Sequence, residues 1–202
     1  AYIWKIRKEL SEALDEFDLS DIPLYVDNTP TIWKISHGSI SEENRIIFEE
    51  RKVAVMHSNT RAKAGAKVSQ GEMFMGRIKK DDYFYLCYGN SVRLLGQFTT
   101  NEAFLNPEMK DGWYEREYRL IAKSKDTSAY KNIHKWWSPN DNSTCIEVEE
   151  KDRDLFEEVI LKPYFDISLE KLFNTAEQSK GHWWLTANPK IWSFADIGIG
   201  EE

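Results

Sequence analysis

The chain has 202 residues, of which 41% are hydrophobic and 30% are charged, and its formal net charge at pH 7 is −7. A chain of this length and composition can bury a core for one domain, or for one domain and part of another. It shows no secretory signal, and no apolar run approaches the roughly 20 residues of a membrane-spanning helix, so we expect a cytoplasmic protein without a membrane partner. Its two cysteines, Cys87 and Cys145, favour buried reduced thiols over a disulfide.

The first part of the chain alternates between helical and strand patterns. Apolar residues at helical spacing predict an amphipathic helix over residues 2–17, and the β-branched and aromatic residues 31–36 (TIWKIS) predict a strand. A capping-box spacing that starts at Ser39 predicts a helix over about residues 41–51. The short apolar run 53–56 then predicts a buried strand.

The middle of the chain contains a hairpin pattern. Before it, residues 57–80 lack a clear period and predict a loop with a short helix. Residues 83–88 and 91–98 flank Gly89-Asn90, a pair that suits a two-residue hairpin turn because both residue types tolerate positive φ. Alternation over residues 113–123 predicts a further strand.

The last part of the chain is mainly helical. A strand is predicted over residues 145–148, a helix over 152–161 with Pro163 just past its end, a short helix over 165–173, and a polar linker over 174–180. The predicted elements do not repeat as strand–helix units. Their order favours an α+β fold in which helices flank a small mixed curled sheet or β-barrel.

A strongly basic block occupies residues 51–80. It holds eight Lys and Arg residues and a single acid, Glu72, so its net charge is +7 in a chain of −7. Clustered Lys and Arg gain from displacing counterions around phosphates, which indicates a polyanionic partner, although a solvated basic loop is an alternative interpretation. The candidate phosphate-binding residues are Arg61, Lys63, Lys67, Arg77, Lys79 and Lys80.

Aromatic and small polar residues occur close to the basic block in the predicted fold. A nucleobase removed from its stack needs flat aromatic walls and a few hydrogen-bonding groups for its Watson–Crick edge. The candidate base-pocket residues that supply both are Trp33, Ser36, His57, Ser58, Asn59, Tyr88, Trp113 and Tyr114. Each aromatic residue taken alone is an ordinary core residue, and the combination with the basic block favours nucleic acid.

Signatures of catalysis are sparse. The chain has no Gly-rich phosphate loop, no Gly-x-Ser-x-Gly elbow and no Cys-x-x-Cys, and its four histidines lack metal-ligand spacing, so we expect no metal and no cofactor. A divalent-metal nuclease pattern is approximated by Pro139, Asp141, Glu149 and Lys151. Its spacing departs from that pattern, and an exposed acidic loop explains these residues better.

Four runs occur in order along the chain: TIWKIS, VAVMHSNT, DDYFYLCYGNSVRLLGQFT and WYEREYRLIAKS. Together they resemble the EVE, YTH and PUA superfamily of modified-base readers, especially the N-terminal modules of McrB-like restriction enzymes, over about residues 31–173. The tail from Gly181, GHWWLTANPKIWSFADIGIGEE, is similar to the opening strand and Asn-Pro-x-x-Trp-Ser turn of a second EVE domain. The matching features there are Trp183, Trp184, Asn188, Pro189, Trp192 and Ser193.

The resemblance implies a division of the chain into three parts. Residues 1–30 would be an N-terminal helix and connector, residues 31–176 an EVE/YTH-like reader domain, and residues 177–202 a linker and the start of a second EVE-like domain. The chain opens on Ala1 and would be a piece of a longer protein. Such architectures place reader modules ahead of an AAA+ motor domain, a GTPase that works with a separate nuclease subunit, so both activities would lie outside this chain.

The resemblance also implies where the base binds. The family fold is a small mixed barrel flanked by helices, and an aromatic cage at one end of the barrel holds the flipped base. In the YTH branch the strand after the first helix ends in a cage Trp followed by Ser-Thr, whereas this chain has Met56 and His57 there, followed by Ser58. The walls would then come from Trp33, Trp113, Tyr114 or Tyr88. N6-methyladenine and modified cytosine both stay open, as do DNA and RNA.

The leading hypothesis is a non-catalytic DNA-binding module, with no enzyme activity of its own, that flips a modified base, for example a methylated one, into an aromatic pocket. Its partner would be double-stranded DNA carrying that base, and it would target a McrB-like GTP-dependent restriction complex. One alternative is a protein-interaction or oligomerisation module with a basic docking face. The other is a metal-dependent nuclease that uses Asp141 and Glu149.

Overall fold

The computed structural model describes residues 29–38, 40–109 and 111–179. The strands are β1 (Ile32–Ser36), β2 (Val53–His57), β3 (Tyr83–Tyr88), β4 (Ser91–Phe98), β5 (Phe104–Leu105), β6 (Trp113–Lys123) and β7 (Cys145–Glu147). The helical segments are α2 (Glu42–Arg51), α3 (Gln70–Glu72), the π-helix η2 (Met73–Arg77), the 3-10 helix η3 (Glu150–Asp152), α4 (Arg153–Phe156), the π-helix η4 (Glu157–Phe165) and α5 (Leu169–Ser179).

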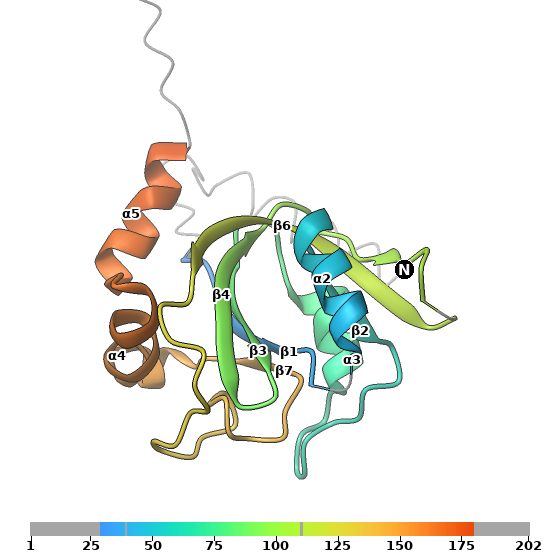
Figure 1. The fold of residues 1–202 in the computed structure, drawn as a ribbon, viewed down its shortest axis with the longest axis horizontal. Coiled ribbons are helices and arrows are strands. Elements are labelled where there is room, and N and C mark those ends of the chain that lie inside the picture. Colours follow the sequence, from blue (N-terminus) through green and yellow to red (C-terminus); the bar gives the residue numbers. More distant parts are fainter. Residues whose placement is uncertain (1–28, 39, 110, 180–202) are drawn as a thin grey trace, which may run out of the picture.

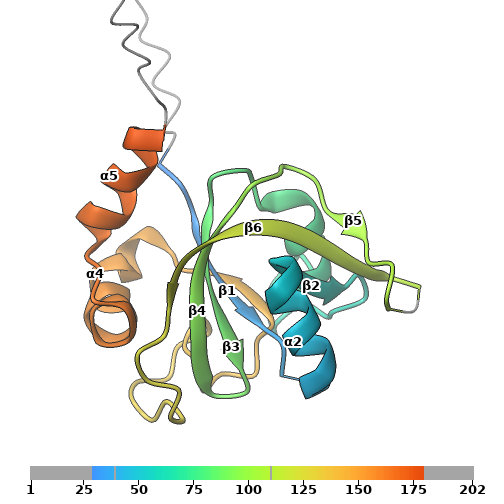
Figure 2. The same cartoon turned by 45° about the horizontal axis from the view of Figure 1, so that its top comes forward.

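Within the described residues the strands form one curled mixed sheet, in the order β2-β6-β4-β3-β1-β7 with β5 added on β6 (Figure 1). Helix α2 lies on one side of this sheet, and α4 and α5 lie on the other (Figures 1 and 2). The prediction of an α+β fold with a curled mixed sheet is confirmed at this level. No described helix is long and apolar enough to cross a membrane. The predicted helix 2–17 and the tail from Gly181 lie outside the described residues.

The hairpin of β3 and β4 forms the centre of the sheet. Its turn is the predicted Gly89-Asn90, and of these two residues Gly89 has a positive φ, 55°. Successive side chains of a strand point to opposite faces. Tyr83 and Tyr85 therefore pack toward α4 and α5, while Phe84 and Leu86 pack inside the curl. Because β3 is buried on both faces, its sequence is a nearly continuous apolar run.

Strand β6 causes the sheet to curl, because its two halves pair with different strands. Its second half pairs with β4, and its first half pairs with β2 and β5 (Figure 2). The pairing with β4 shifts register between Leu95 and Gly96, and such a bulge increases the local twist. A Cβ at Gly96 would lie 2.6 Å from the Phe84 ring, so this close crossing requires glycine. The curl brings the end of β2 next to the end of β1.

Helix α2 confirms the prediction for residues 41–51, with Ser41 as its N-cap. The Ser41 hydroxyl accepts a hydrogen bond from the Asn44 N–H at 3.4 Å, and the helix ends at Lys52, whose φ of 56° is left-handed. The predicted capping residue, Ser39, lies outside the described residues. Cys87 and Cys145 are buried free thiols, as predicted.

The C-terminal helical region differs from the prediction in two ways. The helical path does not stop before Pro163 but continues as η4 to Phe165. A proline ring clashes with the carbonyl four residues earlier in a regular α-helix, and the wider π-helical turn accommodates it. The prediction of a polar linker over residues 174–180 was also wrong, because α5 runs through Ser179.

Candidate functional site

A cavity of about 250 Å³ lies where the chain leaves β1 and β2 and where β6 begins. It is lined by Ser36, Ile40, Val55, Met56, His57, Thr60, Trp113 and Thr144. Three predicted base-pocket residues, Ser36, His57 and Trp113, therefore lie together although they come from three different strands. An aromatic ring, an imidazole and several hydroxyl groups line a space with an apolar side.

His57 and Trp113 are neighbours because β2 and β6 pair antiparallel and place them opposite each other. Their rings meet edge to face, with centroids 5.4 Å apart and planes at 89°. The Asn59 backbone N–H donates to His57 Nδ1 at 3.0 Å, so the neutral ring carries its proton on Nε2. Gly112 has a φ of 88°, and a Cβ there would lie 2.8 Å from His57 Nε2, so glycine is required against this ring.

The turn after β2 is held tightly by backbone contacts. Thr60 donates twice to the His57 carbonyl, from its N–H at 3.0 Å and from its hydroxyl at 2.7 Å. Helix α3 packs directly on this turn, because a Cβ at Gly71 would lie only 2.0 Å from the Ser58 carbonyl oxygen. The predicted residues Ser58 and Asn59 therefore shape the backbone beside the cavity, and neither side chain lines it.

Gln70 fastens the first part of the basic block to the cavity wall. This side chain is 6% exposed, and its oxygen accepts hydrogen bonds from the N–H groups of Thr144 and Cys145 at 2.7 and 3.1 Å. Its amide group donates to the Arg61 carbonyl at 2.7 Å. Sequence analysis missed Gln70 and Thr144, because a single polar residue at the edge of a loop gives no signal of a partner more than 70 positions away.

His37 holds the opposite side of the cavity together. Its Nε2 atom accepts a hydrogen bond from the Val55 N–H at 3.1 Å, which links the end of β1 to the middle of β2. The ring also stacks on Tyr88, with centroids 6.0 Å apart. Burial, together with the nearby Arg45 guanidinium, lowers the pKa of His37 to about 3, so the ring is neutral at physiological pH.

The predicted phosphate-binding residues fall into two groups. Arg61, Lys63 and Lys67 lie on the loop between Thr60 and α3, next to the cavity, and the Lys63 ammonium donates to the Asp141 carboxylate at 2.7 Å. We call these three residues the basic loop. Arg61 and Lys67 are exposed and form no ion pair with any residue that the structure describes.

The second group, Arg77, Lys79 and Lys80, does not lie beside the cavity. Lys79 and Lys80 come just before Tyr83, the first residue of β3, whereas Ser36 at the cavity pairs with Cys87 near the other end. At roughly 3.3 Å per residue these two ends are about 13 Å apart. Arg77 lies near Glu147, at the end of β7 that is remote from Thr144.

Trp33 and Tyr114 do not reach the cavity, which corrects their prediction as cage walls. Trp33 is 3% exposed in the core inside the curl, and its indole N–H donates to the Asp82 carboxylate at 3.0 Å. Tyr114 packs against the same core. Its neighbour Trp113 lines the cavity, whereas Tyr114 does not.

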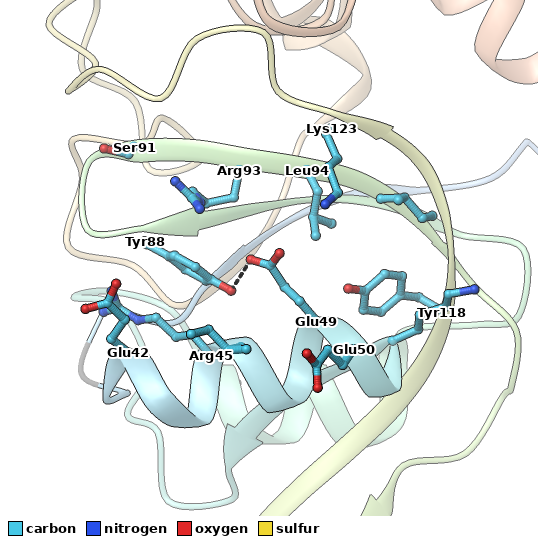
Figure 3. A pocket seen from close by; sticks show the side chains of 13 residues that line it. Glu42, Arg45, Glu49, Glu50, Tyr88, Ser91, Arg93, Leu94, Tyr118 and Lys123 are labelled. Carbon is cyan, nitrogen blue, oxygen red and sulfur yellow. Dashed lines mark hydrogen bonds between the residues drawn. The ribbon is translucent and has the colours of Figure 1, made fainter.

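Tyr88 lies in a different and larger cleft of about 590 Å³ between α2 and strands β4 and β6 (Figure 3). Its hydroxyl donates to Glu49 at 2.6 Å, and burial raises its pKa well above the usual range. The Arg45 and Arg93 guanidinium carbons lie 4.5 and 5.1 Å from the centre of its ring. The cleft carries acidic groups on α2 and basic groups on both α2 and the strands, so its charge is mixed and it does not favour a polyanion.

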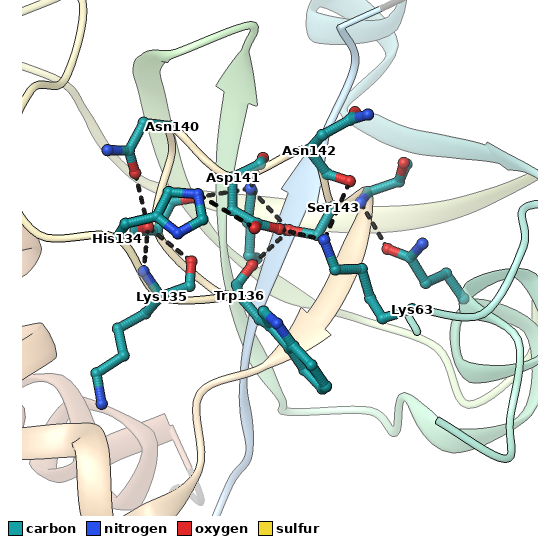
Figure 4. A network of polar contacts seen from close by, with 12 residues as sticks. Lys63, His134, Lys135, Trp136, Asn140, Asp141, Asn142 and Ser143 are labelled. Carbon is teal, nitrogen blue, oxygen red and sulfur yellow. Dashed lines mark hydrogen bonds and ion pairs between the residues drawn. The ribbon is translucent and has the colours of Figure 1, made fainter. Parts of the chain in front are cut away.

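A third cavity, of about 410 Å³, adjoins the first and shares Ser36 and Thr144 with it. One wall of it is the loop over residues 140–144, of which Figure 4 shows Asn140, Asp141, Asn142 and Ser143. A buried lysine, Lys34, holds this loop in place. The Lys34 ammonium donates to the Ser138 and Asp141 carbonyls at 2.7 and 2.8 Å and to the Ser143 hydroxyl at 2.9 Å. Burial lowers the pKa of Lys34 to about 8.

The two acids of the nuclease pattern each form an ion pair with a lysine of the same chain. Asp141 pairs with Lys63 at 2.7 Å and with His134 at 3.4 Å, and Glu149 pairs with Lys151. Among the described residues no group of three His, Cys, Asp or Glu side chains is placed to hold a metal ion. Asp141 and Glu149 thus act here as ion-pair partners within the chain.

Comparison with known proteins gives no assignment. No family model, no curated protein and no solved structure matches this chain. The resemblance to EVE, YTH and PUA modules therefore stays a prediction, and the function is argued from the cavity and its surroundings.

Proposed function

We propose that this domain is a non-catalytic module that binds a modified base of double-stranded DNA, extruded from the duplex into the cavity of about 250 Å³. One observation carries the proposal: Ser36, His57 and Trp113 converge on a single cavity at the base of the basic loop. Ligand pockets for larger molecules begin at roughly 300 Å³, so this smaller space suits one ring system.

The lining groups match the needs of an unstacked base. Trp113 offers a flat wall, and stacking on such a wall contributes about 1–3 kcal/mol per base. The proton on His57 Nε2 is a hydrogen-bond donor, and the Thr60 hydroxyl, which donates to the His57 carbonyl, is left with acceptor lone pairs. Met56 and Val55 on the apolar side would accommodate a methyl group.

The basic loop would hold the phosphates on either side of the extruded base. Arg61 directly follows the cavity residue Thr60, Lys67 lies seven positions after it on the same loop, and both are exposed. They would contact a strand that enters the cavity. These contacts would supply affinity, and the cavity would supply selectivity. By its resemblance to McrB-like enzymes, the module would recruit a GTP-dependent motor and a nuclease subunit to modified sites.

A binding titration tests the proposal with matched duplexes that contain N6-methyladenine, 5-methylcytosine or no modification. We expect wild type to prefer one modified duplex and Trp113→Ala to lose about tenfold in affinity for it, since one stacking contact is removed. Tyr88→Phe is the matched control, because Tyr88 lies in the other cleft and its loss of a hydroxyl should leave DNA binding unchanged.

Two results would count against a base reader. One is equal affinity of wild type for all three duplexes, and the other is a loss in Tyr88→Phe as large as that in Trp113→Ala. The protein-interaction alternative predicts concentration-dependent sedimentation without nucleic acid, and abolition of this assembly by Lys63→Glu with Lys67→Glu.

A further inference from the structure

Two adjacent tryptophans, Trp136 and Trp137, have opposite environments. Trp137 is 2% exposed, its indole N–H donates to Asp152 at 2.8 Å, and its ring packs edge to face on Phe156 with centroids 5.7 Å apart. Trp136 is 49% exposed. An exposed indole ring can serve as a stacking surface, because every nucleobase has a π-face.

The backbone of Trp136 is fixed from two directions. The Ser143 hydroxyl donates to the Trp136 carbonyl, and the buried Lys34 ammonium donates to Ser143, which places Trp136 in the same network as β1. The carbonyl of the next residue accepts a hydrogen bond from the Tyr85 hydroxyl of β3. A ring held on such a support loses little conformational entropy when a ligand stacks on it.

Two lysines lie near Trp136, and each forms an ion pair: Lys135 with Asp152 at 3.1 Å and Lys63 with Asp141 at 2.7 Å. Figure 4 shows the Trp136 ring projecting away from the polar network, between Lys135 and Lys63. Lys63 belongs to the basic loop, and its partner Asp141 lines the cavity that adjoins the base cavity through Ser36 and Thr144. The loop that carries Lys63 also carries the exposed Arg61 and Lys67, and an aromatic face beside a cationic loop is the combination that binds single-stranded nucleic acid.

We propose that Trp136 is a second stacking platform, which binds an unpaired nucleobase of the strand whose phosphates contact the basic loop. This inference rests on the proposed function for the path of the strand and deepens it, because it makes the ligand a locally single-stranded segment and not one isolated base. A protein partner fits less well, because among the nearby described residues only Ile133, 37% exposed, adds apolar surface.

The test compares two probes that differ only in their bases. One is a labelled oligothymidylate of about ten nucleotides, within the site sizes of single-strand binders, and the other is an abasic oligomer of the same length. For Trp136→Ala we expect about a tenfold loss of affinity for oligothymidylate and no change for the abasic oligomer, which keeps the phosphates. Trp136→Phe should keep most of the affinity, because it keeps an aromatic face.

A matched control uses Phe104→Ala, because Phe104 is 48% exposed on β5 and has no place in this network. It should bind both probes as wild type does. The platform is refuted if Trp136→Ala binds oligothymidylate normally, if it loses the abasic oligomer equally, or if Phe104→Ala loses as much. Failure of the base-reader proposal would appear separately, as a lack of preference for a modified duplex. The comparison of oligothymidylate with the abasic oligomer would still test the platform.

Discussion

Protonation of His37 should be one of the main costs of lowering the pH. In the folded chain burial and Arg45 lower the pKa of His37 to about 3, whereas the unfolded chain has the ordinary value of 6.5. Below pH 6.5 the unfolded state therefore binds a proton that the folded state does not, and stability falls as the pH falls toward 3. The stabilisation is fully present above pH 6.5.

The magnitude follows from the two pKa values. Each pH unit inside this window costs up to about 1.4 kcal/mol, so from about pH 5.5 to 3.5 His37 alone should remove about 2.5 kcal/mol of unfolding free energy. We propose His37→Gln as the test, because the Gln side-chain oxygen can still accept from the Val55 N–H but does not titrate. Carboxylates contribute equally to both proteins, so they cancel in the difference.

The assay is urea unfolding of wild type and His37→Gln at several pH values between 7 and 3.5. We expect the plots of unfolding free energy against pH to converge as the pH falls, because only wild type loses stability through His37. Phe48→Leu is the control, because its ring meets His37 edge to face and it does not titrate, so its curve should stay parallel to that of wild type. Parallel curves for wild type and His37→Gln would refute the assignment of a buried neutral imidazole.

Three further predictions concern the support of the site. Gly71→Ala should destabilise the fold by about 1–3 kcal/mol in urea unfolding, because its Cβ would collide with a backbone oxygen, whereas Gly76→Ala, with open space around it, should change stability by less than about 0.5 kcal/mol. Equal effects of the two would contradict the close packing of α3. In duplex binding, Lys67→Gln should lower the slope of log affinity against log salt concentration by about 0.9. Lys80→Gln, at the far end of β3, should leave this slope unchanged, and a larger effect of Lys80→Gln than of Lys67→Gln would place the DNA elsewhere. Lys34→Met should lower the unfolding free energy by about 2–4 kcal/mol, because three buried acceptors lose their hydrogen-bond donor. An unchanged thermal melting temperature would show that these acceptors do not need the lysine.

The sequence by itself determined the elements whose signals are local. The hairpin of residues 83–98 was predictable because its strand patterns and a Gly-Asn turn lie within one short stretch. Helix α2 was predictable because a capping signal lies directly before it in the sequence. The π-helical path through Pro163 was not predictable, because it depends on a hydrogen-bonding pattern that proline normally interrupts.

Which side chains meet at the site was decided only by the tertiary structure. Trp33 and Trp113 are both tryptophans in predicted strands. A hydrogen bond to Asp82, 49 positions away, holds Trp33 in the core, while the pairing of β2 with β6 places Trp113 at the cavity. The charge of the basic block was evident in the sequence, yet the path through α3 to the start of β3 divides it between two ends of the sheet. The physical reason is the same in each case: the environment of a side chain is set by long-range contacts, and those depend on how the sheet curls.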